Sequence, residues 1–179
     1  CNALVKSGDE YFNIFPAWNW TRIPGTTAPQ MAEVPLAQHD WQQEGTSQFA
    51  GGVTDSIYGA TAYAYDDTWA GIDTRAKKAW FFFDNEIVCL GSGITSSNAN
   101  PVFTTLNQRL AHKTDAVLYA EGKKVMTAKD ADHIKASNIS WVSHDGTGYV
   151  FPKGGNVVLD FDIQKGKWKD INHSMPNRE

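Results

Sequence analysis

The chain has few cysteines and no recognisable metal-binding pattern. Its 179 residues include two cysteines, Cys1 and Cys89, which are too few to form a disulfide framework. A Cys1–Cys89 disulfide stays an open alternative to a free, buried Cys89 that packs as a small hydrophobe. The five histidines show none of the close spacings that are typical of metal ligands. The sequence therefore predicts no metal site.

Long apolar runs and a strong charge of one sign are also missing. No apolar run approaches the roughly 20 residues that cross a membrane, so we expect no membrane partner. Sixteen basic and 20 acidic residues give a net charge of −4, which gives no support to a nucleic-acid partner. Nothing at the first residues resembles a signal peptide, and we expect the chain to be an internal piece of a longer protein.

Self-contained catalytic motifs are equally scarce. The chain has no Gly-x-Ser-x-Gly nucleophile motif, and its Gly-Gly pairs open no predicted helix that would hold a phosphate. The adjacent carboxylates Asp9-Glu10 and Asp66-Asp67 would point to opposite faces of a strand, so they suit turns better than acid–base catalysis. We therefore expect no catalytic residue on this chain.

Aromatic residues are abundant and indicate an all-β protein. They make up 12% of the chain, with seven Trp, six Tyr and nine Phe, and an excess of Trp is typical of sugar-handling surfaces. Residues 77–94 (KKAWFFFDNEIVCLGSGI) consist of an aromatic run, an Asp-Asn turn and a β-branched run. This pattern predicts a tight antiparallel hairpin, buried on both faces in the interior of a large β-sandwich.

Turn signals recur about every ten residues and leave room for short strands. We expect Pro16 to Pro35 to be a long loop anchored by Trp18, Trp20 and Ile23, and residues 49–53 to be a turn with close backbone approach. Residues 129–136 are ambiguous. The whole chain, residues 1–179, is predicted to be one antiparallel β-sandwich unit without an internal boundary. The predicted strands besides the hairpin cover residues 3–6, 11–14, 56–65, 103–106, 116–119, 123–125, 139–143, 148–151 and 156–163.

Several motifs occur in the same order as in one known family. They are WNWTRIPGTT at residues 18–27, FAGGVTD at 49–55, the hairpin at 77–94, TTLNQR at 104–109, HDGTGYVFP at 144–152 and GKWKDIN at 166–172. With them the chain resembles the central β-sandwich of family 8 polysaccharide lyases, which include chondroitin AC, hyaluronate and xanthan lyases. The resemblance spans essentially the whole chain. It implies a supersandwich of the galactose-mutarotase type, of which this chain is an incomplete part.

The resemblance also implies an activity and a location. Enzymes of this family are secreted or periplasmic bacterial proteins with an N-terminal α/α toroid, the sandwich and a small C-terminal β domain. They cut uronic-acid-containing glycosaminoglycans such as chondroitin or hyaluronan by β-elimination, and their Tyr, His, Asn and Arg catalytic group lies on the toroid. The implied partners are therefore an acidic polysaccharide and the toroid domain. This chain would support the cleft, whereas the parent protein would be the carbon–oxygen lyase.

A few positions match functional residues of the family. Trp41 matches an aromatic residue that stacks on a sugar, although anchoring the core is the alternative. Trp18, Trp20 and Arg22 are further candidates for substrate binding. Some relatives bind calcium through acidic residues at the positions of Asn19, Thr21 and Gln30. Because Ca²⁺ prefers carboxylate oxygens, the neutral residues here predict no calcium and no other cofactor.

Two other functions stay open at this stage. The chain could be a free-standing carbohydrate-binding module that uses Trp18, Trp20 and Trp41 as a glycan platform. It could also be an unrelated sugar epimerase on the same fold. An epimerase needs a His and a carboxylate that face each other, whereas His144 and Asp145 are adjacent in sequence and would point apart.

Overall fold

The computed structural model describes residues 2–35, 46–112, 116–128 and 133–171. Their contacts gather into two compact units, and each is described here by itself. Unit 1 comprises Cys1–Leu4 and Asn19–Gln108, and unit 2 comprises Val5–Trp18 and Arg109–Glu179. Within the described ranges, no helix is long and apolar enough to cross a membrane.

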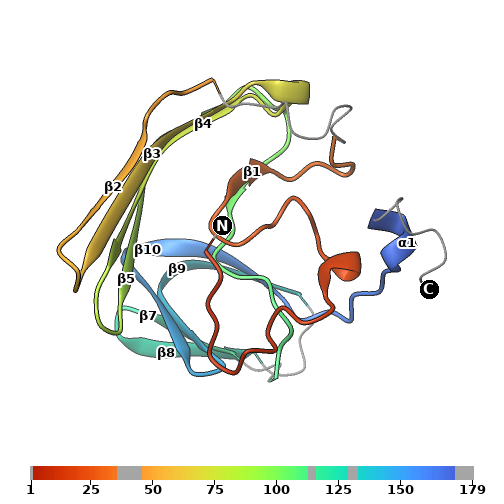
Figure 1. Ribbon diagram of the computed structural model, residues 1–179. Helices are drawn as coiled ribbons and strands as arrows, with labels where there is room; N and C mark the ends of the chain where they lie inside the picture. The colour runs from red at the N-terminus through yellow and green to blue at the C-terminus, as the bar shows by residue number, and fades with distance from the viewer. Residues whose placement is uncertain (1, 36–45, 113–115, 129–132, 172–179) are drawn as a thin grey trace. The chain divides into compact units, whose positions relative to one another are not determined.

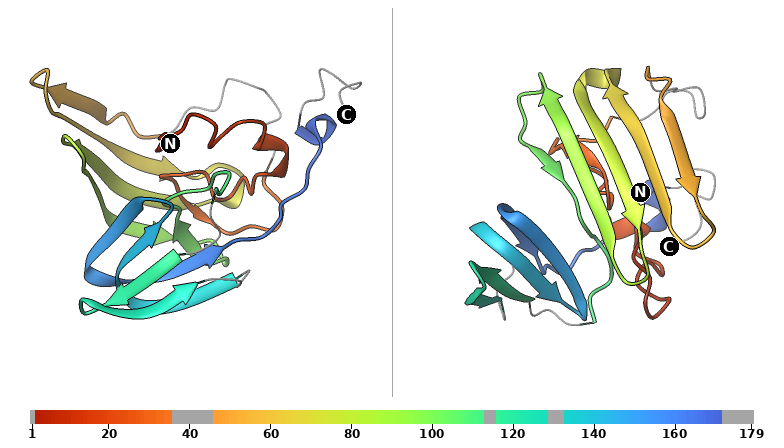
Figure 2. Two further views of the ribbon diagram at one scale, coloured as in Figure 1. Left: turned by 90° about the horizontal axis from the view of Figure 1, so that it is seen from below. Right: turned by 90° about the vertical axis from the view of Figure 1, so that its left-hand side faces the viewer.

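Unit 1 is built on a four-stranded antiparallel sheet (Figure 1) with the order β2-β3-β4-β5. Its strands are β2 (Ala50–Thr54), β3 (Gly59–Asp67), β4 (Thr74–Phe82) and β5 (Ile87–Ser96). The right-hand view of Figure 2 shows them side by side, from orange to green. A turn closes β4 onto β5, with the Phe83 N–H donating to the Glu86 carbonyl over 3.0 Å. The hairpin predicted at residues 77–94 is therefore confirmed.

The burial predicted for this hairpin is wrong. Buried and exposed residues alternate along most of β4, and almost all of β5 is exposed. β5 is also an edge strand of the described sheet rather than an interior one. A continuous apolar run shows that a strand can be covered on both faces, but the cover comes from segments distant in sequence. The buried positions of β4 are Thr74, Ala76, Lys78 and Trp80.

Two other parts of unit 1 refine the predictions. The segment expected to be a turn at residues 49–53 is mostly the strand β2. Its close backbone approach is real, because a Cβ on Gly52 would lie 3.0 Å from the Ala60 carbonyl oxygen. Inside the long loop, β1 (Thr27–Pro29) pairs with β6 (Val102–Thr104) as a two-stranded antiparallel ribbon. A single 3-10 turn, η2 (Trp69–Gly71), precedes β4.

Unit 2 contains the second antiparallel sheet, with the order β10-β9-β7-β8. Its strands are β7 (Ala116–Ala120), β8 (Lys123–Ala128), β9 (His133–His144) and β10 (Thr147–Asp160). Side chains of β7 and β9 form its hydrophobic core. The buried residues of β7 alternate, because successive residues of a strand point to opposite faces, whereas those of β9 do not keep this spacing, since its pairing with β10 contains register shifts. The buried members of this core are Ala116, Leu118, Ile134, Ile139 and Val142.

Several strand predictions in unit 2 need correction. Residues 3–6, which begin in unit 1, form no strand, and residues 11–13 form a turn in which Asn13 has a φ of 56°. The strands predicted at 148–151 and 156–163 are one long strand, β10, interrupted by register shifts between Val150 and Val157. Among the described residues of unit 2, helical structure is limited to the 3-10 turn η1 (Phe15–Ala17) and the short α1 (Trp168–Ile171). The all-β, antiparallel fold class is confirmed.

Candidate functional site

In unit 1, one glutamine connects two of the sequence motifs. The Asn19 N–H donates to Gln108 Oε1 over 2.8 Å. Gln108 Nε2 in turn donates to the carbonyl oxygens of Asn19 at 3.0 Å and Arg22 at 2.9 Å. The side-chain amide thus closes the loop that begins with Asn19 onto the segment that follows β6. The motifs at residues 18–27 and 104–109 meet here, and their polar groups are used in internal contacts.

Trp20 and Arg22 lie in the same turn but differ in accessibility. The Arg22 N–H donates to the Asn19 carbonyl over 2.9 Å, which places Trp20 at the tip of the turn with 39% of its surface exposed. The Arg22 guanidinium lies over the Phe103 ring, 5.8 Å from its centroid. Of the predicted sugar-binding residues in unit 1, Trp20 is therefore partly exposed, whereas Arg22 lies against Phe103.

The three positions that replace calcium ligands do come together. Asn19 Oδ1 accepts hydrogen bonds from the Thr21 N–H and hydroxyl, at 3.0 and 2.6 Å. Gln30 Oε1 accepts a hydrogen bond from Arg22 Nε at 2.9 Å, and Gln30 Nε2 points to the Thr21 carbonyl at 3.4 Å. This arrangement brings no carboxylate and places a cationic guanidinium on one of the candidate oxygens. The residues present do not fit Ca²⁺, which prefers several carboxylate or carbonyl oxygens.

Two of the aromatic candidates lie elsewhere. Trp18 belongs to unit 2, where it is half-buried and meets Tyr11 and Phe15 edge to face at centroid distances of 6.2 and 5.1 Å. This packing suits the anchoring role predicted for it. Trp41 and Cys1 lie outside the described residues, so the stacking role of Trp41 and the Cys1–Cys89 disulfide stay predictions.

A buried lysine joins the β1 region to the sheet of unit 1. Lys78 Nζ donates to the Gly25 carbonyl at 2.6 Å and to Thr27 Oγ1 at 2.9 Å, and it lies 5.6 Å from the centroid of the Trp80 ring. Burial lowers the pKa of Lys78, whereas the nearby Cys89, which the sequence predicts to be buried, is exposed on β5. The cation is thus satisfied by two oxygens and an aromatic face.

In unit 2, the chain between Lys6 and Glu10 folds around a carboxylate. Glu10 is 1% exposed, and its two oxygens accept the backbone N–H groups of Lys6, Ser7 and Gly8 at 2.6, 2.8 and 2.9 Å. These hydrogen bonds, led by the one from Ser7, lower the pKa of Glu10. Asp9-Glu10 is thus a turn-forming pair, as the sequence predicts.

Arg109 connects this turn to the hairpin between β9 and β10. Its side chain is 4% exposed and lies between Glu10, with Nη1 to Oε1 at 3.5 Å, and Asp145, with Nη2 to Oδ2 at 2.9 Å. Asp145 and Gly146 form the hairpin turn with φ values of 47° and 71°, which is typical of an Asp-Gly turn with positive φ at both central residues. Lys6 Nζ adds a hydrogen bond to the Gly146 carbonyl at 2.9 Å.

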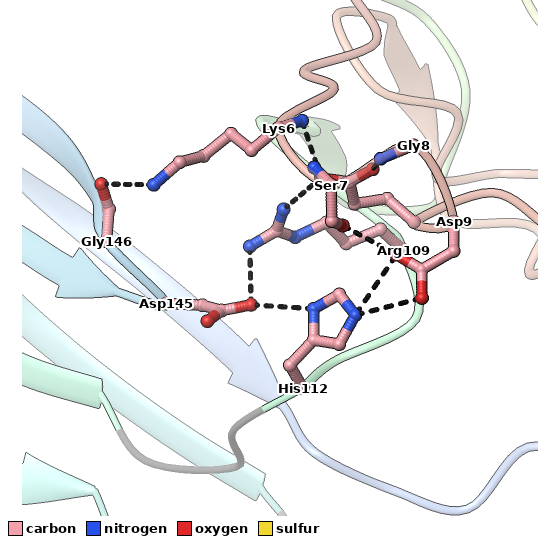
Figure 3. A network of polar contacts seen from close by, with 9 residues as sticks. Lys6, Ser7, Gly8, Asp9, Arg109, His112, Asp145 and Gly146 are labelled. Atoms are coloured by element: carbon pink, nitrogen blue, oxygen red, sulfur yellow. Dashed lines mark hydrogen bonds and ion pairs between the residues drawn. The ribbon is translucent and has the colours of Figure 1, made fainter.

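His112 completes the network and lies between two carboxylates (Figure 3). Its Nδ1 is 3.3 Å from Asp145 Oδ2, and its Nε2 is 3.2 Å from both oxygens of Asp9. The hydrogen bonds to Asp9 and Asp145 raise the pKa of His112. Burial acts to raise the pKa of Asp145, but the hydrogen bond from His112 and the charge of Arg109 outweigh it and lower that pKa.

Sequence reasoning did not single out this network, although Arg109 and Asp145 lie in motifs that it quoted. Its members come from three separate segments, and Asp9 and His112 are 103 residues apart. The adjacent His144 and Asp145 do take different partners, because the His144 ring packs on Phe161 with centroids 5.2 Å apart. In the described part of the chain, no group of three or more His, Cys, Asp or Glu side chains is arranged to hold a metal ion.

Comparison with known proteins identifies the family. The super-sandwich domain of polysaccharide lyase family 8 matches residues 1–179, and the chain belongs to this family. Chondroitinase-AC of Pedobacter heparinus is 44% identical over 177 residues, which cover 96% of this chain and 23% of that protein. Hyaluronate lyase of Thermasporomyces composti is 30% identical, over 96% of this chain and 22% of that protein. Xanthan lyase of a Bacillus species (strain GL1) is 32% identical, over 95% of this chain and 18% of that protein.

Solved structures show the same similarity in three dimensions. A chondroitinase AC lyase determined as enzyme–oligosaccharide complexes matches with a TM-score of 0.81 and 40% identity, over 92% of this chain and 23% of that one. Streptomyces coelicolor A3 chondroitin AC lyase in complex with chondroitin sulphate matches with a TM-score of 0.66 and 26% identity, over 96% of this chain and 21% of that one. The chain thus spans less than a quarter of the length of each of these proteins.

Proposed function

We propose that this chain is part of the central β-sandwich of a secreted or periplasmic bacterial lyase that cleaves uronic-acid-containing glycosaminoglycans by β-elimination. The match to the family 8 super-sandwich domain along the whole chain carries this proposal. Two of the similar proteins are named for chondroitin and hyaluronate. The chain itself supports the substrate cleft and contains no catalytic residue.

The use of the motif side chains supports a structural role. In the motif TTLNQR, Gln108 directs its amide group and Arg109 its two Nη atoms to other groups of the chain. Asp145 of the motif HDGTGYVFP likewise binds Arg109 and His112. Such groups position backbone segments and are not left facing a substrate. We therefore assign these motifs to the framework of the sandwich.

The chemistry would come from the remainder of the parent protein. β-Elimination removes a weakly acidic proton beside the uronate carboxylate, so it needs a general base and donors that neutralise the developing dianion. We propose that a Tyr, His, Asn and Arg group on an N-terminal α/α toroid supplies them, and that a small C-terminal β domain follows the sandwich. Residues 1–179 would then be one segment of the middle domain.

A comparison of the parent protein with this chain tests the proposal. Both would be incubated with chondroitin, hyaluronan and xanthan, and the absorbance of the unsaturated uronide product followed. We expect product from the parent on at least one of these polysaccharides and none from the chain alone. Product formation by the chain alone would contradict the location of the catalytic group, and a parent inactive on all three would contradict the lyase assignment.

A carbohydrate-binding role is the second candidate, and the partial exposure of Trp20 favours it. A flat aromatic ring can cover the apolar face of a pyranose. Trp20→Ala should weaken binding of chondroitin oligosaccharides at least severalfold, whereas Trp20→Phe should retain most of it. Phe12→Ala is the matched control, because Phe12 is an exposed aromatic residue of unit 2. Equal affinities for Trp20→Ala and the wild type would remove Trp20 from the site.

The same binding measurement tests Trp41, and a stability measurement tests Trp18. We propose that Trp41 stacks on a sugar, so Trp41→Ala should weaken binding as Trp20→Ala does. Trp18→Ala should lower stability, because Trp18 packs against Tyr11 and Phe15. Unchanged affinity of Trp41→Ala would leave Trp41 with only an anchoring role.

A further inference from the structure

One histidine in unit 2 bridges two carboxylates that belong to different segments. His112 follows Arg109 in the chain, Asp9 lies in the turn around Glu10, and Asp145 forms the β9–β10 turn. Both ring nitrogens are within 3.3 Å of a carboxylate oxygen. Figure 3 shows the ring between the two acidic side chains. This geometry uses two donors, and an imidazole has two donors only when it is protonated.

We propose that His112 is a pH-operated latch, which when protonated ties the turn at Asp9 to the β9–β10 turn at Asp145. In the neutral ring one nitrogen carries a lone pair instead of a proton. That lone pair would face a carboxylate oxygen, so one of the two connections has to open. The latch therefore closes at low pH and opens on one side as the pH rises.

The surroundings indicate which side opens. The Asp145 side chain is 15% exposed, whereas that of Asp9 is 55% exposed. Loss of a donor is more costly where water cannot replace it. The neutral ring should therefore keep its proton on Nδ1, toward Asp145, and lose the connection from Nε2 to Asp9. Water and the Ser7 hydroxyl, which donates to Asp9 Oδ1 at 2.5 Å, would then satisfy Asp9.

The charges around His112 support the same pH-operated latch. Asp9 and Asp145 face the ring directly, Arg109 lies on the other side of Asp145, and His144 acts on Asp145 from the end of β9. Glu10 and Lys6 complete the cluster from the turn. Apart from His144, the cluster contains three basic and three acidic side chains, and their charges sum to zero only while His112 is protonated. They are Lys6, Arg109 and His112 against Asp9, Glu10 and Asp145.

The sign of the pH effect follows from linkage. The two carboxylates raise the pKa of folded His112 above its ordinary value of 6.5. A raised pKa means that the folded chain holds the proton more tightly than the unfolded chain does. The contribution of the latch to stability is therefore fully present below pH 6.5 and is lost as the pH rises through the folded-state pKa of His112. Its opening should be local, because Glu10 still holds the turn through three backbone N–H groups.

Titration of the ring by NMR in the full chain is the first test. We expect His112 to titrate above 6.5 in the wild type, and Asp9→Asn to shift its midpoint downward. Asp160→Asn is the matched control, because it removes a carboxylate paired with a different histidine, His133, and should leave the His112 midpoint unchanged. A wild-type midpoint at or below 6.5, or one that Asp9→Asn does not move, would overturn the proposal. Asp9 is exposed, so this variant is expected to fold.

Amide hydrogen exchange tests the opening itself. The Phe12 N–H donates to the Asp9 carbonyl at 3.0 Å, and the Leu110 N–H donates to the Glu10 carbonyl at 2.8 Å. After correction for base catalysis, exchange at Phe12 relative to Leu110 should increase across the His112 midpoint. The ratio should not change with pH in His112→Asn, which cannot titrate there. A flat ratio in the wild type, or a step that persists in His112→Asn, would refute the latch.

Discussion

Replacement of Lys78 probes the contact that joins β1 to the sheet of unit 1. Lys78 is buried, and its ammonium group donates to the Gly25 carbonyl and the Thr27 hydroxyl. Lys78→Met keeps most of the aliphatic stem but removes the charge and both donors. The Thr27 hydroxyl retains a partner in Thr104, with the two oxygens 2.9 Å apart. The main cost should therefore arise at the Gly25 carbonyl, which loses its cationic donor.

The expected magnitude follows from these contacts. Hydrogen bonds from a charged donor contribute about 1.5–3 kcal/mol each, but removal of Lys78 also removes the cost of burying a cation. The two effects partly cancel, and Lys78→Met should lower the free energy of unfolding by about 1–3 kcal/mol. Lys78→Ala additionally loses three buried methylene groups, which adds about 2 kcal/mol.

Urea unfolding, followed by tryptophan fluorescence and circular dichroism, measures these changes as a shift of the midpoint at constant slope. Lys77→Met is the matched control, because Lys77 is the exposed neighbour on the same strand, and it should change stability by less than about 0.5 kcal/mol. A double-mutant cycle of Lys78→Met with Thr27→Val should be non-additive. Equal stabilities of Lys78→Met and the wild type would refute the reasoning.

The pH dependence gives an independent check on Lys78. Burial lowers the pKa of the folded Lys78 ammonium group below its ordinary value of 10.5. Between these two pKa values the unfolded chain binds the proton more strongly than the folded chain does. Wild-type stability should therefore gain a contribution as the pH rises from the lowered folded-state pKa toward 10.5. Lys78→Met should lack this contribution, and an identical pH profile in the two proteins would contradict it.

Four further outcomes are expected. Leu118→Ala should lower the free energy of unfolding by about 2–5 kcal/mol through a cavity in the unit 2 core, and a loss below 1 kcal/mol would contradict that core. Gln108→Ala should cost about 1–3 kcal/mol by calorimetry, because three hydrogen bonds are lost. The lowered pKa of Glu10 means that its contribution is present above its ordinary value of 4.5 and is lost as the pH falls, so Glu10→Gln should flatten the acid limb of the stability profile. Addition of Ca²⁺ or EDTA should leave the Tm unchanged, because Asn19 and its neighbours provide no carboxylate, and a calcium-dependent Tm would refute this.

Local patterns in the sequence were sufficient for much of the secondary structure. The hairpin at residues 77–94 has two apolar runs on either side of an Asp-Asn turn, and β4 and β5 form as this pattern predicts. The segment at residues 11–14 is also partly apolar, yet residues 11–13 form a turn. Its conformation depends on packing of Tyr11 against Trp18, which a short window does not contain. A four-residue apolar pattern such as the one at residues 11–14 therefore predicts a strand less reliably than the eighteen-residue hairpin pattern at residues 77–94 does.

The candidate site was less predictable than the strands. The motifs around Trp20 and Gln108 were recognised, but their meeting in space depends on hydrogen bonds across 89 residues of chain. Asp9-Glu10 was assigned to a turn, although nothing nearby indicates that His112 would bind Asp9. Polar partners distant in sequence leave no periodic signal, because their spacing depends on the path of the whole chain.

The amino-acid sequence by itself indicated the family through the order of its motifs. It also determined the antiparallel β class and the position of the central hairpin, because alternation and turn chemistry act between neighbouring residues. Tertiary structure alone decided that Glu10 is buried under three backbone N–H groups and that Arg109 and His112 converge on Asp145. It also decided that β5 is an exposed edge strand in the described sheet. The physical reason is the same in each case, since burial and charge pairing depend on which distant segments fold against a residue.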